Sequence, residues 1–367
     1  MTAALIGVAM AVAVSAAEAR DLVYGAWVSP KHGILVHALP PFFDAVEKQT
    51  GGAVKWKLVA GGQLVSGRTT LPGIRDGIID AGFIIPSYTP KELPGNALIM
   101  EVQVFGNDTV AASAAAAETV MLDCPQCLAD FRKQNAVYLA GHAASAFNIM
   151  CKPKVEKFSD LRGLKVRASG SGNKLVKMFG AVPTPMSPAE GLTSMERGAL
   201  DCVLGAIAWL ESYGYQDIVK TVVDYPLGIV GALGTVVMNR DTWNNLTLDQ
   251  KRAHLDQMPR VSASSVIDAY IKADERVAIR ARAKGISFVK GSPEYDQVVS
   301  KFEDAERQSL IATGKRLGVK DPEAILAAYR KNLKKWQGLS PAIGTDVDKY
   351  SAALKREIYD RIDPGKL

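Results

Sequence analysis

The sequence contains few residues of the kinds that carry out enzymatic chemistry. It has four histidines, and no two of them have the spacing of a metal site. It contains no Gly-x-Ser-x-Gly and no His-Glu-x-x-His, and the glycine run 169–172 lacks the Lys-Ser/Thr of a phosphate-binding loop. These absences argue against hydrolases, zinc peptidases and nucleotidases. We therefore expect no catalytic residue, no metal and no cofactor.

Long basic tracts are also missing, although the chain carries a net charge of +6 and has a pI of about 9.0. Lys and Arg alternate with Asp and Glu throughout, without the clustered arginines and aromatics of a nucleic-acid-binding surface. A basic surface of this kind is compatible with a small acidic ligand. With 367 residues and 48% hydrophobic content, we expect a globular protein of about two domains that does not bind nucleic acid.

The only long apolar run lies at the start, in residues 1–19. It ends in Ala17-Glu18-Ala19, which resembles a secretory cleavage site, and we expect cleavage before Arg20. The usual basic start of such a signal is missing. The alternative is a short membrane anchor, but the run is shorter than the roughly 20 residues that a span needs. Export to the periplasm is therefore favoured.

Cysteine is scarce, with four residues at positions 124, 127, 151 and 202. An even number in an exported chain is compatible with two disulfides, and three pairings are open. We favour Cys124–Cys127 because the pair is local, which leaves Cys151–Cys202. The Cys-x-x-Cys could instead be a redox centre, or half of a zinc site that lacks its other half. Free thiols are a further alternative.

The first third of the chain alternates predicted strands and helices. We expect strands at Leu22–Trp27, Val54–Val59 and Asp80–Ile85. Helical spacing covers His32–Lys48, which Pro40-Pro41 would interrupt, and Thr70–Gly77. This order predicts an α/β fold in which a mainly parallel sheet is covered by helices.

A short internal similarity suggests two related halves. Leu71–Gly82 and Leu192–Val203 each read as an amphipathic helix, a glycine, two apolar residues, an aspartate and a strand. Gly77 and Gly198 stand where a helix ends in the left-handed conformation. Two such units indicate two similar α/β lobes, although a match of this length can also arise by chance.

The last third is predicted to be mostly helical. Leu246–Lys284 is the longest stretch with helical spacing; Pro259 should break it and Gly285 should end it. We expect a strand at Ile286–Val289 and two outer helices at Tyr295–Thr313 and Pro322–Trp336.

The most informative segment is Leu164–Arg167 and the residues that follow it. An arginine ends a predicted strand, beside the turn Ala-Ser-Gly-Ser-Gly-Asn and the start of a helix at Lys174. The planar guanidinium matches a carboxylate, and a helix start adds unpaired N–H groups. Arg167 is therefore our main candidate for binding an anion. The alternative is an ordinary structural ion pair.

The same segment resembles a known family. DLRGLKVR, GAVPTPMSPAE and MERGALD are similar to the core signature of the DctP-type substrate-binding proteins of tripartite ATP-independent periplasmic (TRAP) transporters. The order of elements fits from Val23 to about Gly338. In that family the arginine at the position of Arg167 pairs with the carboxylate of an organic acid.

The resemblance implies a two-lobed periplasmic binding protein, each lobe a mainly parallel sheet flanked by helices, with a long helix across both lobes. Lobe I would comprise 20–144 and 232–270, and lobe II 145–231 and 271–367. The protein would be a monomer without enzymatic activity. It would close over an organic anion and deliver it to the integral membrane subunits.

The chain departs from two branches of this family. The second arginine of the sialic-acid branch falls on Phe147, and Gly205 lies near the position of its asparagine. The Glu-Trp with which the ketoacid branch holds a metal is absent from 203–205. We therefore expect a metal-free site with one anion clamp, suited to a carboxylate with an apolar or aromatic body.

Further candidate wall residues follow the ends of predicted strands, where open α/β sheets place ligands. Each could equally be an ordinary packed residue, and a histidine could cap a helix or be solvated. The candidates are Trp27, His32, Tyr88, Phe147, Gly205 and Trp209.

Two other functions remain open. A sensory binding protein of the same fold would present its ligand to a receptor. A periplasmic thiol-disulfide enzyme would use Cys124 and Cys127.

Overall fold

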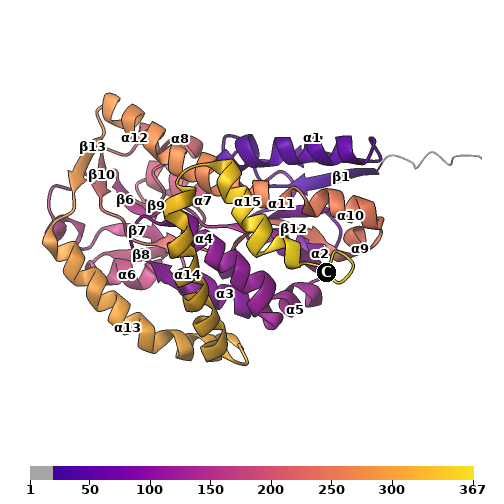
Figure 1. Ribbon diagram of the computed structural model, residues 1–367. Coiled ribbons are helices and arrows are strands. Elements are labelled where there is room, and N and C mark those ends of the chain that lie inside the picture. Colours follow the sequence, from indigo (N-terminus) through magenta and orange to yellow (C-terminus); the bar gives the residue numbers. More distant parts are fainter. Residues whose placement is uncertain (1–19) are drawn as a thin grey trace, which may run out of the picture.

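The protein has two α/β lobes that lie side by side (Figure 1). The computed structural model describes residues 20–367, except for the side chains of Arg20, Arg307 and Gln308. The expected signal segment 1–19 lies outside the described residues. Within the described chain, no helix is long and apolar enough to cross a membrane.

Lobe I is built on a five-stranded sheet in the order β2-β1-β3-β12-β5. Its strands are β1 (Arg20–Gly25), β2 (Val54–Val59), β3 (Ala81–Ile84), β5 (Ala136–His142) and β12 (Leu233–Asn239). The strands β2, β1 and β3 are parallel, whereas β12 runs antiparallel to both of its neighbours.

Lobe II is built on a six-stranded sheet in the order β13-β10-β6-β9-β7-β8. The strands are β6 (Asn148–Cys151), β7 (Lys165–Ala168), β8 (Val182–Pro185), β9 (Cys202–Gly205), β10 (Thr221–Asp224) and β13 (Ser287–Lys290). Here β6 runs antiparallel to both neighbours. A short ladder of β4 (Gln103–Val104) and β11 (Ile229–Val230) joins segments outside the two sheets.

The expected two-lobed α/β fold with mainly parallel sheets is confirmed: in each sheet every strand but one, β12 in lobe I and β6 in lobe II, runs in the same direction. Both sheets are mixed. The chain leaves lobe I at the end of β5 and enters lobe II directly as β6, and it returns through β11 into β12. Parallel neighbouring strands need a long crossover connection, usually a helix. The segments that pass between the lobes have no such helix, so β6 and β12 are antiparallel to their neighbours.

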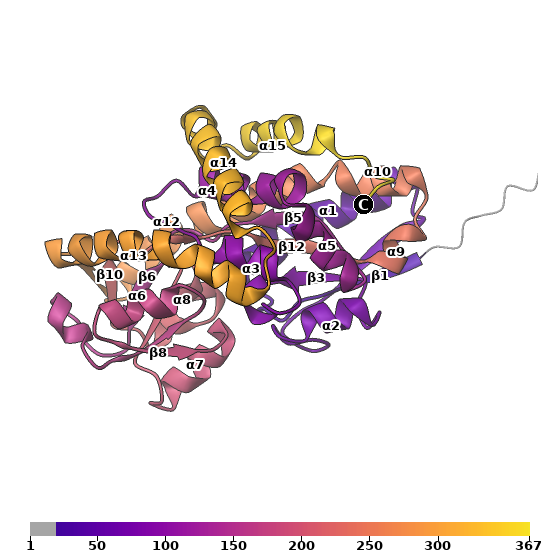
Figure 2. The same ribbon diagram turned by 90° about the horizontal axis from the view of Figure 1, so that it is seen from below.

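Helices cover both sheets (Figures 1 and 2). In the first half of the chain they are α1 (Leu39–Gln49), α2 (Thr70–Arg75), α3 (Pro94–Glu101), α4 (Thr109–Glu118), α5 (Pro125–Lys133), α6 (Gly172–Met178) and α7 (Pro188–Glu196). In the second half they are α8 (Trp209–Ser212), α9 (Arg240–Asn244), α10 (Leu248–Leu255), α11 (Met258–Val266), α12 (Lys272–Ala283), α13 (Pro293–Leu317), α14 (Pro322–Ile343) and α15 (Val347–Glu357).

The two sequence-similar units have the same local geometry. Gly77 and Gly198 follow α2 and α7 with φ of +73° and +75°, the left-handed conformation that favours glycine. The next aspartate bonds back to the neighbouring strand in both lobes. Asp80 accepts from the Val23 N–H at 2.8 Å, and Asp201 accepts from the Lys165 N–H at 2.8 Å. The internal similarity therefore marks one structural unit that occurs in both lobes.

The helical stretch predicted at 246–284 is divided into α10, α11, a π-helical turn at Ile267–Ile271, and α12. Pro259 stands in the first turn of α11, where a missing N–H costs little, so the predicted break is confirmed. Within this stretch α11 packs on β5 of lobe I, and α12 packs on α8 of lobe II. The expected long helix across both lobes is thus a series of shorter helices.

The C-terminal helices correct the predicted lobe boundaries. We assigned 271–367 to lobe II, but α14 and α15 pack on α4 and α11 of lobe I. The reason is a buried polar anchor: the Trp336 indole N–H donates to Glu118 at 2.6 Å, and Lys335 pairs with the same carboxylate at 2.7 Å. The alanine side chains of α4 are small, which lets α14 pack closely on this helix.

Both disulfides are formed among buried cysteines. Cys124 is bonded to Cys127 at the start of α5, and Cys151 is bonded to Cys202. Cys151 and Cys202 stand directly opposite each other on the antiparallel strands β6 and β9. The second bond therefore ties together two strands that are 51 residues apart in the chain.

The two disulfides should contribute unequally to stability. A cross-link restricts the unfolded chain more when it closes a longer loop, which gives about 4 kcal/mol for Cys151–Cys202 and about 2 kcal/mol for Cys124–Cys127. We expect the Cys151→Ala/Cys202→Ala variant to lose roughly twice as much free energy of unfolding as the Cys124→Ala/Cys127→Ala variant. Urea titrations measure both. Equal losses would contradict this reasoning.

Candidate functional site

Arg167 lies at the end of β7 and is almost completely buried, with 2% of its surface exposed. Its Nε donates to the Met186 carbonyl at 2.8 Å and its Nη1 to the Leu204 carbonyl at 3.2 Å. Its Nη2 lies 3.5 Å from the Tyr88 hydroxyl of lobe I. These three contacts fix the guanidinium in place. Because an arginine has five N–H donors, Arg167 still has donors for another acceptor.

Among the residues that the structure describes, the charge of Arg167 has no ionic partner. No carboxylate of the described residues lies within 4.0 Å of its guanidinium. Glu190 is close enough for Arg167 to help lower the pKa of that carboxyl, after the larger effects of the Ser187 backbone N–H and hydroxyl. A buried charge without a partner is costly, so this position favours an incoming anion.

Aromatic side chains of lobe II surround the guanidinium. The Trp209 ring lies 5.3 Å from the guanidinium carbon of Arg167, and the Phe147 ring packs on Trp209 at 5.2 Å. Gly205 lies under the indole, where a Cβ would come within 2.1 Å of the ring. Only glycine allows this stacking. The structure thus brings together four sequence candidates: Arg167, Phe147, Gly205 and Trp209.

Lobe I supplies the facing wall. Trp27 stacks on Phe83 at 5.6 Å and lies 5.9 Å from the Tyr88 ring, while its indole N–H donates to the Phe83 carbonyl. Tyr88 is in the turn after β3 and makes the contact with Arg167 described above. Burial raises the pKa of its hydroxyl, and Arg167 acts in the opposite direction, so Tyr88 is neutral at ordinary pH.

Between these walls lies a cavity of about 30 Å³. Its lining is almost wholly apolar apart from Arg167 and Ser169. Sequence reasoning missed several members, which have no signal of their own in the chain: Phe83, Ile85, Met100, Pro188, Leu233 and Tyr270. The volume is enough for a water molecule, and Tyr88 of lobe I is in contact with Arg167 of lobe II beside it.

His32 does not line this cavity. It is buried one layer away, where its Nδ1 accepts from the Ile34 N–H at 3.4 Å and its Nε2 lies 3.4 Å from the Tyr270 hydroxyl. Burial lowers its pKa to about 4. His32 instead lines the neighbouring pocket between the lobes, so its role as a ligand-contacting residue stays a prediction. It is a neutral residue that supports Tyr270.

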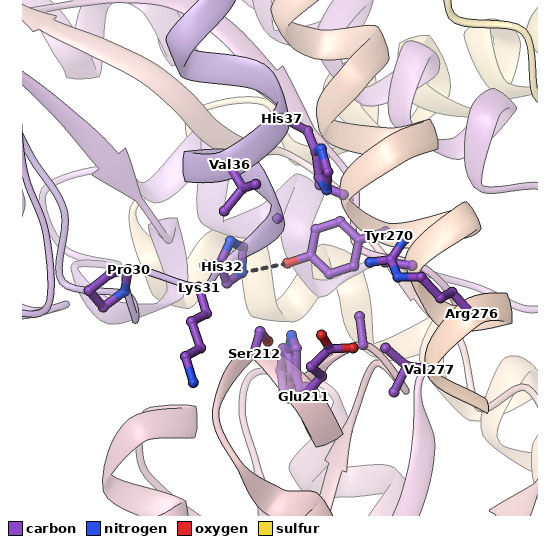
Figure 3. Close-up of a pocket in the computed structure, with 15 residues that line it drawn as sticks. Pro30, Lys31, His32, Val36, His37, Glu211, Ser212, Tyr270, Arg276 and Val277 are labelled. Carbon is purple, nitrogen blue, oxygen red and sulfur yellow. Dashed lines mark hydrogen bonds between the residues drawn. The ribbon is translucent and has the colours of Figure 1, made fainter. Parts of the chain in front are cut away.

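Two larger pockets flank the central cavity, both between the lobes. One has a volume of about 290 Å³ and lies beyond Trp209 and Tyr270 (Figure 3). The other, of about 270 Å³, lies beyond Trp27 and contains Arg68 and Glu190. The guanidinium of Arg68 lies over the Tyr88 ring at 5.9 Å. Sequence analysis missed Arg68; the glycine-rich loop 61–67 after β2 was the available signal.

The largely buried carboxyl group of Asp274 on α12 links two other segments of the chain. It accepts hydrogen bonds from the Ala208 N–H at 2.6 Å and from the Ser145 hydroxyl. Burial raises the pKa of Asp274 to about 7, although these two bonds act to lower it. Asp274 thus holds the segment between β5 and β6 against the segment before α8.

The described residues offer no other reactive centre. No group of three or more His, Cys, Asp or Glu side chains among them could hold a metal ion. Cys124 and Cys127 are 1% and 0% exposed. A redox centre needs an accessible sulfur, so this burial argues against the thiol-disulfide alternative.

Residues 25–308 match the DctP family model, which is described as bacterial extracellular solute-binding protein, family 7. Among curated proteins, the Monocarboxylate 2-oxoacid-binding periplasmic protein all3028 of Nostoc sp. is 24% identical over 264 residues, 70% of either chain. The protein YiiZ of Salmonella typhimurium is 29% identical over 167 residues. That match covers 42% of this chain and spans about half, 48%, of YiiZ.

Solved structures of TRAP solute-binding proteins have the same fold. One from Rhodoferax ferrireducens, with copurified benzoate, has a TM-score of 0.76 at 18% identity and covers 88% of this chain and 99% of its own. One from Bordetella bronchiseptica, with bound (R)- and (S)-mandelate, has a TM-score of 0.73 at 23% identity and covers 86% and 99%.

The raised pKa of Asp274 should make stability depend on pH. The folded chain keeps the Asp274 proton up to about pH 7, while the unfolded chain releases it near 3.8, so this residue's contribution to stability falls as pH rises between these values. Asp274→Asn has no proton to release. We expect its free energy of unfolding, relative to wild type, to increase over that pH range by on the order of a few kcal/mol.

Urea unfolding of both proteins at several pH values measures this difference. Glu303→Gln, which changes an exposed carboxylate of α13 that does not act on Asp274, is the matched control. A difference between Asp274→Asn and wild type that stays constant with pH would contradict the assignment.

Proposed function

Because this chain belongs to family 7 of the bacterial extracellular solute-binding proteins, we propose that it captures an organic carboxylate beside Arg167 and delivers it to the membrane subunits of a TRAP transporter. The observation that carries this proposal is the buried, ionically unpaired guanidinium between two lobes. The protein acts in the periplasm as a monomer and does no chemistry on its ligand. A sensory protein could use the same cavity with a different partner.

A carboxylate supplies the ionic partner that the Arg167 guanidinium lacks. Two of its nitrogens are already held by the Met186 and Leu204 carbonyls, so the fork is oriented before the ligand arrives. A charge-assisted hydrogen bond is worth about 1.5–3 kcal/mol, and a fixed donor loses little entropy on binding. The site is therefore organised for a planar anion.

The body of the ligand should be apolar or aromatic. The cavity is walled by the rings of Trp27, Phe83, Phe147 and Trp209, which offer stacking faces and few hydrogen-bonding groups. The benzoate and mandelate of the related structures have such a body. The Nostoc relative is named for 2-oxoacids, which keeps small aliphatic carboxylates as candidates.

Binding requires the lobes to move. A cavity of about 30 Å³ is smaller than any organic acid, so the ligand must enter an opened form and be enclosed afterwards. Contacts to both walls exist only in the closed form. The ligand therefore shifts the balance between open and closed states by the difference in its affinity for them.

Replacing Arg167 tests the anion clamp. Arg167→Ala should weaken carboxylate binding about 100-fold or more, because two charge-assisted bonds are lost. Arg167→Lys should also bind poorly, since a point charge does not form a two-pronged contact. Calorimetry would use the best ligand from a thermal-shift screen of organic acids that begins with benzoate.

The titrations should contain a chelator, so that the wild-type affinity also tests our expectation of a metal-free site. Circular dichroism controls for folding. An affinity that is unchanged in both variants would refute the clamp.

Closure can be tested on its own. Solution scattering should give a smaller radius of gyration with saturating ligand than without it, because the ligand stabilises the closed form. Tyr88→Phe removes the hydroxyl that reaches Arg167 across the cleft and should shift the free protein toward the open form. Equal radii with and without ligand, together with unchanged affinity in Trp27→Ala, would restrict the site to lobe II.

A further inference from the structure

Three ionisable side chains lie together where the two lobes meet. Glu101 ends α3 of lobe I, Lys174 lies on α6 of lobe II, and Glu306 lies on α13. The helix α13 follows the last strand of the lobe II sheet and packs on both α3 and α6 (Figure 2). The three side chains are close enough for their charges to act on one another. The cluster therefore joins elements of both lobes.

Several polar atoms of this cluster are buried without a hydrogen-bond partner. Among the described residues, Glu306 Oε1, Lys174 Nζ and Asn173 Oδ1 make no hydrogen bond. The whole Glu306 residue is only 6% exposed. Buried polar groups are nearly always paired, and a buried charge without a partner is costly. The ionisation of the cluster therefore affects the free energy of the arrangement that buries it.

The segment that begins at Glu101 touches the turn next to the ligand site. A Cβ added to Gly170 would lie 3.1 Å from the Glu101 Oε1, so the carboxylate lies against that turn. When the amide of Gln103 is oriented to satisfy both of its ends, its oxygen accepts from the Gly172 N–H at 3.2 Å. This turn directly follows Arg167 in the chain. A change in the cluster is thus transmitted to the turn beside the anion clamp.

The surroundings of Glu306 favour its protonated form. Burial raises the pKa of Glu306 to about 8, while the Gln103 N–H and the charge of Lys174 act to lower it. The carboxylates of Glu101 and Glu303 act in the same direction as burial. Glu303 is exposed, so solvent screens its charge, and Glu101 is the carboxyl that faces Glu306 from the other lobe.

Glu101 has the same preference. Burial raises the pKa of its carboxyl, and the charges of Lys174 and Arg316 oppose this effect. Arg316 is exposed, which leaves Lys174 as the cation inside the cluster. Two carboxyl groups thus share one buried ammonium. A single proton on the pair makes the cluster neutral, and the two carboxyl groups titrate as one coupled unit.

We propose that Glu101, Lys174 and Glu306 form a proton-binding site that couples the closure of the lobes to pH. As the lobes close, one proton from solvent forms an O–H bond with a carboxylate oxygen of the pair. As they open, α3 and α6 separate, water reaches the cluster and the proton leaves. The inference rests on the proposed function only because closure is the step that encloses the ligand.

The sign of the effect follows from the form that holds the proton. The closed form keeps it up to about pH 8, whereas a hydrated glutamate releases it near pH 4.5. Between these values closure takes up a proton, so rising pH favours the open form. The affinity for a carboxylate should fall over the same range, by at most about ten-fold per pH unit for one proton.

Solution scattering tests this coupling without any ligand. From about pH 5.5 to about pH 8.5, the radius of gyration of wild type should increase. Glu306→Gln has a neutral side chain of the same shape, so its radius should stay small and constant. Asp304→Asn changes an exposed carboxylate of α13 that does not act on the cluster, and it should behave like wild type. Asp274→Asn should also retain the increase, which separates the other carboxyl group with a raised pKa.

Calorimetry with benzoate tests the same coupling through binding. The pKa of a free carboxylic acid is about 4, so benzoate is ionised at both about pH 6 and about pH 8. Wild type should bind it five-fold or more weakly at the higher pH, and Glu306→Gln should bind it within two-fold at both. Glu101→Gln is a second variant. It removes the like charge beside Glu306 and should reduce the pH dependence, while circular dichroism controls for folding.

The outcomes separate this inference from the proposed function. A wild-type benzoate affinity that is the same at both pH values would overturn the coupling and leave carboxylate binding intact. A pH dependence that survives in both Glu306→Gln and Glu101→Gln would overturn it as well. If benzoate binds at neither pH, the proposed function is contradicted, and the scattering series alone decides the coupling, since equal wild-type radii overturn it.

Discussion

The structure of the site depends on a positive charge that is buried without an ionic partner. Arg167 is 2% exposed, and its hydrogen bonds go to the Met186 and Leu204 carbonyls and toward the Tyr88 hydroxyl. These contacts engage only part of the N–H donors and do not neutralise the charge. The folded chain therefore carries an electrostatic cost that an anion would remove, and that cost is the physical basis of the proposed carboxylate site.

The fold places this charge by using one structural unit in both lobes. In lobe I, Asp80 ties β3 to β1, and Trp27 and Tyr88 follow the ends of those two strands. In lobe II, Asp201 ties β9 to β7, and Arg167 and Gly205 lie at the ends of those two. Because strand ends of parallel neighbours meet at one edge, the two lobes present their chemistry to each other across the cleft.

The sequence predicted those parts of the structure that follow from local patterns. Strand ends, the glycines after α2 and α7, the break at Pro259 and the arginine of β7 all have a signature within a few residues. The antiparallel strands β6 and β12 have no such local signature, because the direction of a strand depends on where the chain enters the sheet. The attachment of α14 to lobe I depends on Glu118 and Trp336, which are 218 residues apart. Tyr270 likewise reaches the cavity from a distant helix turn.

The closed state gives Trp209 a role that no residue pattern could indicate. Its ring lies over the guanidinium of Arg167 and against Phe147, and Gly205 removes the side chain that would otherwise prevent that position. The same ring forms one wall of the outer pocket. Together with Tyr270, this aromatic residue separates the small cavity beside Arg167 from the larger pocket of Figure 3. The volume of the cavity beside Arg167 therefore depends on the position of the Trp209 ring.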